Sequence, residues 1–329
     1  MKPDLPDRIF NINGRTDFQN KALEVFRFQA ENNQIYKSFI KYLEIDPDAV
    51  SRVEDIPFLP VSFFKKHKVV SGVHSRYIVF ESSGTSGKTT SRHFVTDAGL
   101  YEESFLRTFT MFYGSPSDYM IAALLPSYTE RGNSSLIYMV DRLIRQSCCQ
   151  FSGFYRENIN DLLSNVASAR TGNKKVILIG VSFALLDLSE KYSPDLSGVI
   201  VMETGGMKGR RKEMIREDLH TVLKQKMNVA SVHSEYGMTE LLSQAYSKGD
   251  GIFFSPPWMK IMIRDPLDPL SILQESGKTG GINIIDLANI NSCSFIATDD
   301  LGKLHPDYSF EVLGRFDSSD IRGCNLLLE

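Results

Sequence analysis

The chain has 329 residues, of which 42% are hydrophobic and 23% are charged. This composition is typical of a soluble globular protein and excludes collagen-like, coiled-coil and disordered chains. The 37 basic and 40 acidic side chains give a net charge of −3. No overall positive field therefore favours nucleic acid or an anionic membrane, although a local positive patch stays open, and we expect no nucleic acid partner. The length predicts about two domains, or one large α/β domain with an appendage.

Targeting and membrane signals are absent from the sequence pattern. The first residues carry acids and prolines where a signal peptide needs an apolar segment. The longest apolar stretch, at about 176–188, is interrupted by Gly180 and Ser182 and is too short to span a bilayer. The adjacent pair Cys148 and Cys149 cannot form a CxxC motif. These patterns predict a protein without a membrane span in a reduced, cytoplasmic compartment.

Helices and strands are expected to alternate along most of the chain. Hydrophobic spacing predicts a helix over about 16–46, followed by a proline-punctuated connector at 55–66. Short strands are expected at 77–80 and 94–95, on either side of a Gly/Ser/Thr-rich loop. The elements expected next are helix 98–113, strand 119–125, helix 134–146, strand 175–180, strand 199–203 and helix 212–226.

This order predicts an α/β fold in which helices flank an open, mainly parallel sheet. After Gly251, short strands divided by Pro, Gly and Asp predict a β-rich subdomain. The chain is therefore expected to comprise a helical N-terminal segment packed on the core, an α/β core, the β-rich subdomain and a hinge-like tail. The boundaries of these four parts are expected at 1–75, 76–250, 251–313 and 314–329.

The clearest chemical signal is the Gly/Ser/Thr-rich loop after residue 81. Such a loop lets backbone N–H groups converge on phosphate oxygens, while hydroxyls and a lysine add donors and charge. It is not a Walker A loop, because the first glycine of that motif would fall on Ser82 and a strand follows instead of a helix. A solvated turn is the alternative interpretation. The candidate phosphate-binding residues are Ser83, Gly84, Thr85, Ser86, Gly87 and Lys88.

Three further segments follow in the chain: His-Ser-Glu-Tyr-Gly-Met-Thr-Glu at 233–240, Thr-Asp-Asp-Leu-Gly at 298–302 and Gly-Arg-Phe-Asp at 314–317. With the loop, and with the last of them extending over 314–323, they resemble in type and order the motifs of the adenylate-forming superfamily, which comprises acyl-CoA ligases, luciferases and adenylation domains. Asp299 stands where that superfamily has glycine. Segments 56–65 and 320–326 give a narrower resemblance to the acyl-protein synthetases of bacterial bioluminescence, and the chain is also similar to phenylacetate-CoA ligases.

The resemblance implies ATP and Mg²⁺ as cofactors and distributes their contacts. The loop would hold the β- and γ-phosphates, and two downstream segments would hold the α-phosphate, the metal ion and the nucleoside. The implied roles are Thr239 for the α-phosphate, Glu240 for Mg²⁺, Tyr236 with Gly237 for adenine, Gly205 and Gly206 along adenine, Asp300 for the ribose hydroxyls, and Arg315 near ribose and phosphate.

Ordinary structural interpretations of the same residues stay open. Tyr236 is equally explained as a core aromatic, and Glu240 as a solvated acid at a helix start. Segment 299–302 has the composition of a turn. The scattered histidines, His93, His233 and His305, lack metal-ligand spacing and are interpreted as structural or pocket-lining.

The resemblance also implies what lies beyond residue 314. Adenylate-forming enzymes continue as a small mobile domain with a catalytic lysine, and this chain is expected to lack that domain essentially in full. The positive charge with which that lysine stabilises the transferred phosphate would then have to be supplied by Lys88, Arg315 or a partner subunit.

The predicted function is that of an acid-thiol ligase of the acyl-protein synthetase type. It would convert a carboxylic acid, expected to be a fatty acid, to acyl-AMP and transfer the acyl group to its own Cys324 for delivery to an acyl-CoA reductase partner. Arg322 and Gly323 favour a reactive, accessible thiol there, although a buried small residue is the alternative. The acid pocket is expected to draw on 124–128 and 131–133. A compact phenylacetate-type CoA ligase and a non-catalytic nucleotide-binding protein are the competing functions.

Overall fold

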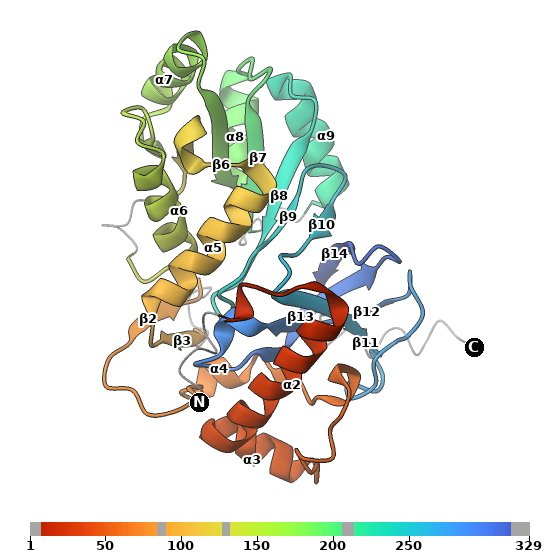
Figure 1. Cartoon of the computed structure of the whole chain (residues 1–329). Coiled ribbons are helices and arrows are strands. Elements are labelled where there is room, and N and C mark those ends of the chain that lie inside the picture. Colours follow the sequence, from red (N-terminus) through yellow and green to blue (C-terminus); the bar gives the residue numbers. More distant parts are fainter. Residues whose placement is uncertain (1–7, 84–89, 127–131, 206–213, 317–329) are drawn as a thin grey trace, which may run out of the picture. The chain divides into compact units, whose positions relative to one another are not determined.

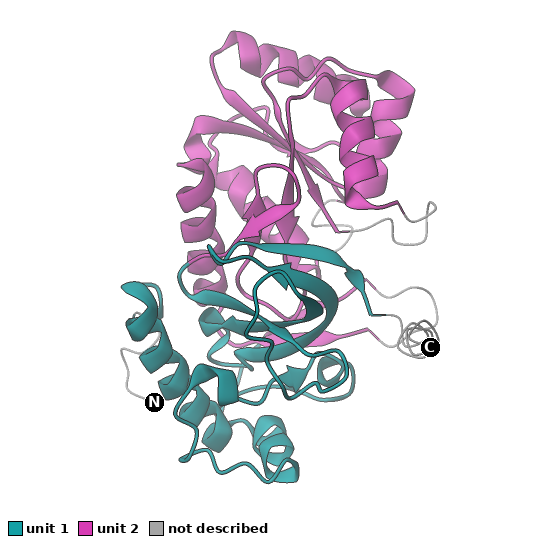
Figure 2. Ribbon diagram, turned by 90° about the vertical axis from the view of Figure 1, so that its right-hand side faces the viewer, with its two compact units in different colours: residues 1–77, 257–329 teal, residues 78–256 magenta. Residues whose placement is uncertain are grey.

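The computed structural model of the protein describes residues 8–83, 90–126, 132–205 and 214–316. The chain forms two compact units, which Figure 2 colours separately. Unit 1 combines residues 1–77 with 257–329, and unit 2 consists of residues 78–256. The N-terminal helices and the last strands of the chain therefore share one unit, while the α/β elements form the other (Figure 1).

Unit 2 contains a two-stranded hairpin followed by alternating helices and strands. Its elements are β2 (Ile78–Glu81), β3 (Arg92–Val95), α5 (Ala98–Tyr113), η2 (Pro116–Asp118), β4 (Tyr119–Leu124), α6 (Ser135–Gln146), β5 (Gly153–Phe154), α7 (Ile159–Thr171), β6 (Lys175–Val181), α8 (Ser182–Tyr192), β7 (Ile200–Thr204), α9 (Arg216–Met227), β8 (Val232–Tyr236), β9 (Ala245–Ser247) and β10 (Ile252–Phe254).

The sheet of unit 2 has the strand order β10-β9-β8-β7-β6-β4-β5. Pairing is parallel from β5 through β4, β6 and β7 to β8, and antiparallel from β8 to β9 and β10. The predicted α/β class with a mainly parallel sheet is therefore confirmed. Hairpin β2–β3 forms a separate antiparallel pair, with Phe80 opposite His93.

Helices cover both faces of this sheet, as the apolar strand sequences require. Alternate strand residues such as Met120, Leu178 and Val201 form one buried cluster with side chains of α7, α8 and α9. On the opposite face, the Tyr119 ring of β4 meets the Phe109 ring of α5 edge-on, with 6.0 Å between the centroids. Because both faces are filled, polar groups reach the sheet mainly at the ends of its strands.

Unit 1 packs helices against antiparallel strands. Its elements are α2 (Gly14–Asn32), α3 (Gln34–Tyr42), η1 (Val53–Asp55), β1 (Leu59–Pro60), α4 (Phe63–Lys66), β11 (Met259–Arg264), β12 (Thr279–Asp286), η3 (Leu287–Asn289), β13 (Phe295–Leu304) and β14 (Phe310–Arg315). Strands β11, β12, β13 and β14 pair antiparallel in that order, and β1 pairs parallel with β13.

An aromatic cluster and one buried amide hold the helices of unit 1 to β13. Phe26 of α2 lies 6.1 Å from the Tyr36 ring and 5.9 Å from the Phe295 ring, centroid to centroid. The Gln29 side chain donates to the Ile290 carbonyl at 2.8 Å and accepts from the Ser294 N–H at 2.9 Å. A fully buried amide with both ends bonded contributes stability without leaving an unpaired polar group.

Three local predictions differ from the structure. The single helix expected at 16–46 is two helices, because Asn33 leaves the helical path and its side chain caps α3 by accepting from the Tyr36 N–H at 3.0 Å. The connector 55–66 contains the short strand β1 and the helix α4. The turn interpretation of 299–302 is wrong, because these residues lie inside β13. No helix in the described ranges has the length and apolar character needed to cross a membrane.

Candidate functional site

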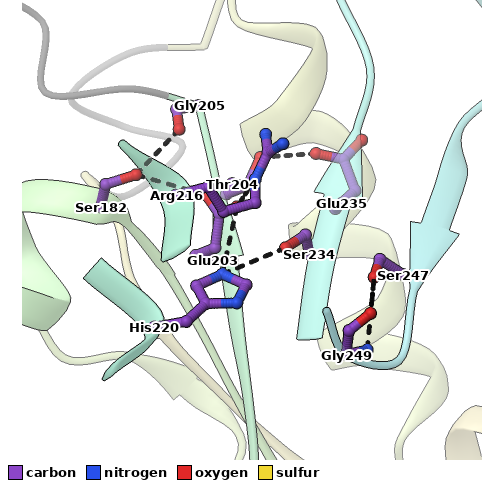
Figure 3. Close-up of polar contacts among 10 residues, drawn as sticks. All are labelled: Ser182, Glu203, Thr204, Gly205, Arg216, His220, Ser234, Glu235, Ser247 and Gly249. Atoms are coloured by element: carbon purple, nitrogen blue, oxygen red, sulfur yellow. Dashed lines mark hydrogen bonds and ion pairs between the residues drawn. The ribbon is translucent and has the colours of Figure 1, made fainter. Parts of the chain in front are cut away.

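The carboxyl ends of β6, β7 and β8 lie side by side at one edge of the unit 2 sheet. Ser182 follows β6, Gly205 follows β7, and β8 ends at Tyr236. The pairing of β7 with β8 sets Thr204 opposite Glu235. Ligands of parallel α/β sheets bind outside this edge. Figure 3 shows the polar residues gathered there, and they include parts of two segments that the sequence analysis selected.

The motif loop, defined as residues 236–240, begins at the last residue of β8. The Tyr236 ring is buried and meets the Phe253 ring at 6.0 Å in an edge-on arrangement. Glu240 is only 5% exposed and lies in a turn, with no helix beginning there. The alternative of a solvated acid at a helix start is therefore wrong for Glu240. A carboxylate buried to this degree needs a hydrogen-bonding or charged partner.

Hairpin β2–β3 holds the two ends of the Gly/Ser/Thr-rich loop together. The Ser82 N–H donates to the Ser91 carbonyl at 3.0 Å, and the Ser91 N–H donates to the Ser82 hydroxyl at 2.9 Å. Two residues further on, Nδ1 of the fully buried His93 lies 2.9 Å from the Thr239 carbonyl oxygen. The base of the loop is thus attached to the motif loop through His93, a contact that no sequence spacing indicates.

A second attachment joins the hairpin to the segment before α6. The Asn133 side chain donates to the Glu81 carboxylate at 2.6 Å, and the Glu81 N–H donates to the Asn133 carbonyl at 2.8 Å. Of the expected acid pocket, Leu124 and Leu125 are buried at the end of β4. Residues 127–131 lie outside the described ranges.

Several predicted site residues also fall outside the described ranges. Ser83 is described and exposed. The phosphate-loop, adenine-loop and acyl-acceptor candidates outside these ranges are Gly84, Thr85, Ser86, Gly87, Lys88, Gly206 and Cys324.

Gly205 begins the segment expected along adenine, and a hydrogen bond from Ser182 fixes its backbone. Its φ of 65° lies in the left-handed region that glycine adopts without strain. Its carbonyl accepts from the Ser182 hydroxyl at 2.9 Å, and the same hydroxyl lies 3.3 Å from Oε2 of Glu203. The start of α8 therefore fixes the exit of β7.

Glu203 is a buried carboxylate that sequence analysis did not select. Nε of Arg216 donates to its Oε1 at 3.0 Å, and Nε2 of His220 lies 3.7 Å from the same oxygen. Burial alone would raise the pKa of Glu203, but the nearby His220 ring and the charge of Arg216 hold the pKa below its usual value. Glu203 is therefore ionised at neutral pH, and its pairing with Arg216 connects the end of β7 to the start of α9.

The neighbouring Ser234, His220 and Glu203 do not form a catalytic triad. Ser234 Oγ lies 3.5 Å from Nε2 of His220, the same ring nitrogen that faces Glu203. A triad histidine needs its two nitrogens directed at two different partners. Ser234 is also fully buried. The cluster is structural.

Replacing Glu203 with glutamine should destabilise the protein by about 3 kcal/mol, the lower end of the cost of breaking a buried ion pair. The change leaves the Arg216 guanidinium facing an amide and removes an acceptor from Ser182. Urea unfolding measures the free energy. Glu217→Gln is the matched control, because Glu217 is exposed in the first turn of α9 and should change stability by less than about 0.5 kcal/mol. Equal stability of the two variants would contradict the assignment.

Glu235 and His233 lie on the other face of β8, toward α5. Thr204 donates its hydroxyl hydrogen to Oε2 of Glu235 at 2.5 Å. Burial raises the pKa of Glu235 to about 7, against the hydrogen bond from Thr204, and the charge of Glu203 adds to the rise. Nδ1 of His233 lies 3.1 Å from the Tyr113 hydroxyl. Burial lowers the pKa of His233 to about 4, and the positive charge of Lys248 adds to the shift.

The low pKa of His233 predicts an acid-dependent loss of stability. The unfolded chain binds a proton at His233 near pH 6.5, whereas the folded protein resists protonation down to about pH 4. Stability should therefore fall as the pH drops through this window, and His233→Gln should fall less steeply. Urea unfolding at several pH values tests this, with the exposed His67→Gln as the control. Parallel curves for wild type and His233→Gln would contradict it.

In unit 1, Asp300 and Arg315 face each other across β13 and β14. Nε of Arg315 lies 3.5 Å from Oδ1 of Asp300. The Asp300 side chain is 11% exposed, whereas that of Arg315 is 83% exposed, so that water screens the pair. The Asp300 N–H donates to the Thr298 hydroxyl at 3.1 Å, and the Thr298 carbonyl accepts from the buried Arg264 guanidinium at 2.6 Å. This backbone support fixes where Asp300 lies on β13.

The described cysteines differ in accessibility. Cys148 is exposed, Cys149 is half-buried and Cys293 is buried, and all three are free thiols. Burial raises the pKa of the Cys293 thiol to about 12, which removes it as a nucleophile at neutral pH. Within the described ranges, no three His, Cys, Asp or Glu side chains gather as a metal-binding group.

Comparison with known proteins agrees with the resemblance seen in the sequence. The sequence model of the family "Acyl-protein synthetase, LuxE" matches residues 13–97, which include the hairpin and its loop. No curated protein matches the chain.

Among solved structures, ATP-bound MatB from Rhodopseudomonas palustris is 17% identical with a TM-score of 0.53, over 72% of this chain and 47% of MatB. A 2-hydroxyisobutyryl-CoA ligase in complex with R3-HIB-AMP is 13% identical with a TM-score of 0.66, over 92% of this chain and 68% of the ligase. The chain thus spans about half the length of MatB. At these identities the similarity shows the fold, which is that of the adenylate-forming enzymes, as predicted.

Proposed function

We propose that the protein activates a carboxylic acid with ATP to form an acyl-AMP and then transfers the acyl group to its own Cys324. The acid is a fatty acid, and the thioester on Cys324 is the form in which a partner reductase takes the acyl group. This proposal joins the acyl-protein synthetase match at residues 13–97 to the motifs that follow it in the chain.

The observation that supports it best is the attachment of the loop base to the motif loop. Segments about 83–90 and 236–240 are far apart in sequence, yet His93 and Thr239 are in direct contact at 2.9 Å. Hydrogen bonds between Ser82 and Ser91 join the two ends of the loop, and Ser91 lies two residues before His93. The base of the loop and Thr239 therefore lie in one region of unit 2, which supports the proposal of one phosphate site.

The residues of the motif loop suit the roles that the resemblance gives them. Glu240 is a nearly buried carboxylate in the loop that contacts the hairpin, and hard oxygen ligands are those that Mg²⁺ prefers. When bound there, Mg²⁺ would neutralise charge on the phosphates. Lys88, with Thr85, Ser86 and Gly87, would hold the β- and γ-phosphates, and Thr239 the α-phosphate. Asp300 and Arg315 would hold ribose.

In the first step, a carboxylate oxygen of the acid attacks the α-phosphorus of ATP. An O–P bond forms, the bond from the α-phosphorus to the bridging oxygen breaks, and pyrophosphate leaves with that electron pair. The protein's part is to hold the two reactants in line and to place the positive charge of Lys88 where charge grows on the leaving group.

In the second step, the Cys324 thiolate attacks the acyl carbonyl of the acyl-AMP. A C–S bond forms, AMP leaves as the anion, and the acyl group remains as a thioester. Because this step needs a free thiol, we place the reaction in a reducing, cytoplasmic compartment. The free state of Cys148, Cys149 and Cys293 is consistent with such a compartment.

Acid-dependent exchange of labelled pyrophosphate into ATP tests the first step. A panel of short, long and aromatic carboxylic acids should reveal exchange that is strongest with long alkyl chains. Preference for aromatic acids would replace the fatty acid by the substrate of a phenylacetate-type ligase. No exchange with any acid, together with measurable ATP binding, would refute activation and leave a nucleotide-binding protein.

A further inference from the structure

Glu235 is a carboxyl group enclosed at the end of β8, one residue before the motif loop. It is 8% exposed and lies between two strands, opposite Thr204 of β7 and Tyr246 of β9. The Thr204 hydroxyl donates a hydrogen bond to its Oε2. Figure 3 shows Glu235 beside Thr204, with a dashed line for their hydrogen bond.

The other oxygen of Glu235 is packed against the first loop residue after Tyr236. A Cβ atom built on Gly237 would lie 2.5 Å from Oε1 of Glu235 and 3.3 Å from Cγ of Gln244. Any side chain at position 237 would therefore displace the carboxyl group. The φ of Gly237 is not positive, and the backbone conformation therefore does not call for glycine. The close approach to Glu235 is what favours glycine at this position. The start of the motif loop thus passes close to the Glu235 carboxyl.

The groups around Glu235 favour its neutral form. Thr204 and Tyr246 are uncharged, and Tyr113 of α5 is a buried phenol whose pKa is itself raised by burial. His233, on the same face of β8, is neutral at pH 7 because burial lowers its pKa to about 4. Glu203, held ionised by Arg216, contributes a like charge. Burial and this charge raise the pKa of Glu235 to about 7, far above that of its partner Glu203.

We propose that Glu235 is a positioning residue that holds the motif loop as a neutral acid, so that ionisation of Glu235 loosens the loop and weakens nucleotide binding. The proposal rests on the proposed function, because it assigns the nucleotide to that loop. A neutral carboxyl accepts the Thr204 hydrogen bond and packs against Gly237 without the desolvation cost of a buried anion. An ionised carboxylate turns toward water and leaves Gly237 without its contact.

The test compares wild type with Glu235→Gln, which keeps the shape and the Thr204 acceptor but cannot ionise. Calorimetry measures MgATP binding from about pH 6 to about pH 8 at saturating Mg²⁺, and amide hydrogen exchange measures the protection of residues 237–241 without nucleotide. We expect wild-type affinity to fall at least ~5-fold relative to Glu235→Gln over this range, with a parallel loss of protection. His233→Gln, a change on the same face of β8, should follow wild type. Glu235→Ala should be unprotected at every pH.

The outcomes separate this inference from the proposed function. Identical pH profiles of wild type and Glu235→Gln, in both binding and exchange, would overturn the role of Glu235 even where MgATP binds. Absence of MgATP binding at every pH, with the exchange difference intact, would overturn the proposed function and leave the positioning of the loop by Glu235 supported.

Discussion

Replacing Cys324 with serine is expected to abolish acyl labelling of the protein while leaving acid-dependent pyrophosphate exchange intact. Incubation of wild type with ATP, Mg²⁺ and a labelled fatty acid should give a protein-bound label that hydroxylamine removes, as expected of a thioester. The serine hydroxyl is a far weaker nucleophile than a thiolate at neutral pH, so that the second step stops while the first continues.

The other cysteines provide matched controls for this prediction. Cys148→Ser is the most demanding control, because Cys148 is exposed and free. Cys293 is enclosed and its thiol has a pKa of about 12, so that it should stay unlabelled in every variant. A labelled Cys324→Ser protein, or a label mapped to Cys148 or Cys149, would refute Cys324 as the acyl acceptor. Such a result would not contradict the formation of acyl-AMP in the first step.

Lys88→Ala and Glu240→Gln should each lower acid-dependent pyrophosphate exchange by at least ~10-fold, because each removes charge or a metal ligand from the transferring phosphates. The two residues belong to different loops that the His93–Thr239 contact connects. A loss in both variants would therefore support one shared ATP·Mg²⁺ site. Exchange rates at saturating acid, with separate titrations of ATP and Mg²⁺, measure the effect.

Two controls separate chemistry from folding in this experiment. Lys66→Ala removes an exposed lysine of α4 and should exchange at the wild-type rate. Glu240 is buried, so that circular dichroism and thermal unfolding must show that Glu240→Gln remains folded. Normal exchange by both Lys88→Ala and Glu240→Gln would show that the nucleotide binds elsewhere.

The sequence predicted the regular elements of unit 2 well because their apolar runs are long. Strand β4 and helix α5 appear within a residue of their expected bounds, since period and burial agree there. Segment 299–302 was misjudged for the opposite reason. Its Asp, Leu and Gly residues are typical of a turn, yet pairing with β12 on one side and β14 on the other makes them part of a strand. Tertiary pairing overrides local preference in this case.

The candidate site was predictable only where residues form a motif along the chain. The segment 236–240 and the hairpin loop are continuous in sequence, and both were selected. Glu203 and Glu235 were not, because their roles depend on strand register and on which face each side chain meets. An acidic residue at the end of an otherwise apolar predicted strand is the signal that would have found Glu203, whereas β8 carries His and Ser beside Glu235 and gives no such signal.

The most direct test of acid activation is the fate of the carboxylate oxygens. A fatty acid labelled in both carboxylate oxygens with a heavy isotope is incubated with the protein, ATP and Mg²⁺, and the products are analysed by mass spectrometry. Attack on the α-phosphorus followed by acyl transfer to Cys324 predicts AMP that carries one heavy oxygen, with pyrophosphate unlabelled. Heavy oxygen in inorganic phosphate with formation of ADP, or unlabelled AMP, would contradict an acyl-AMP intermediate.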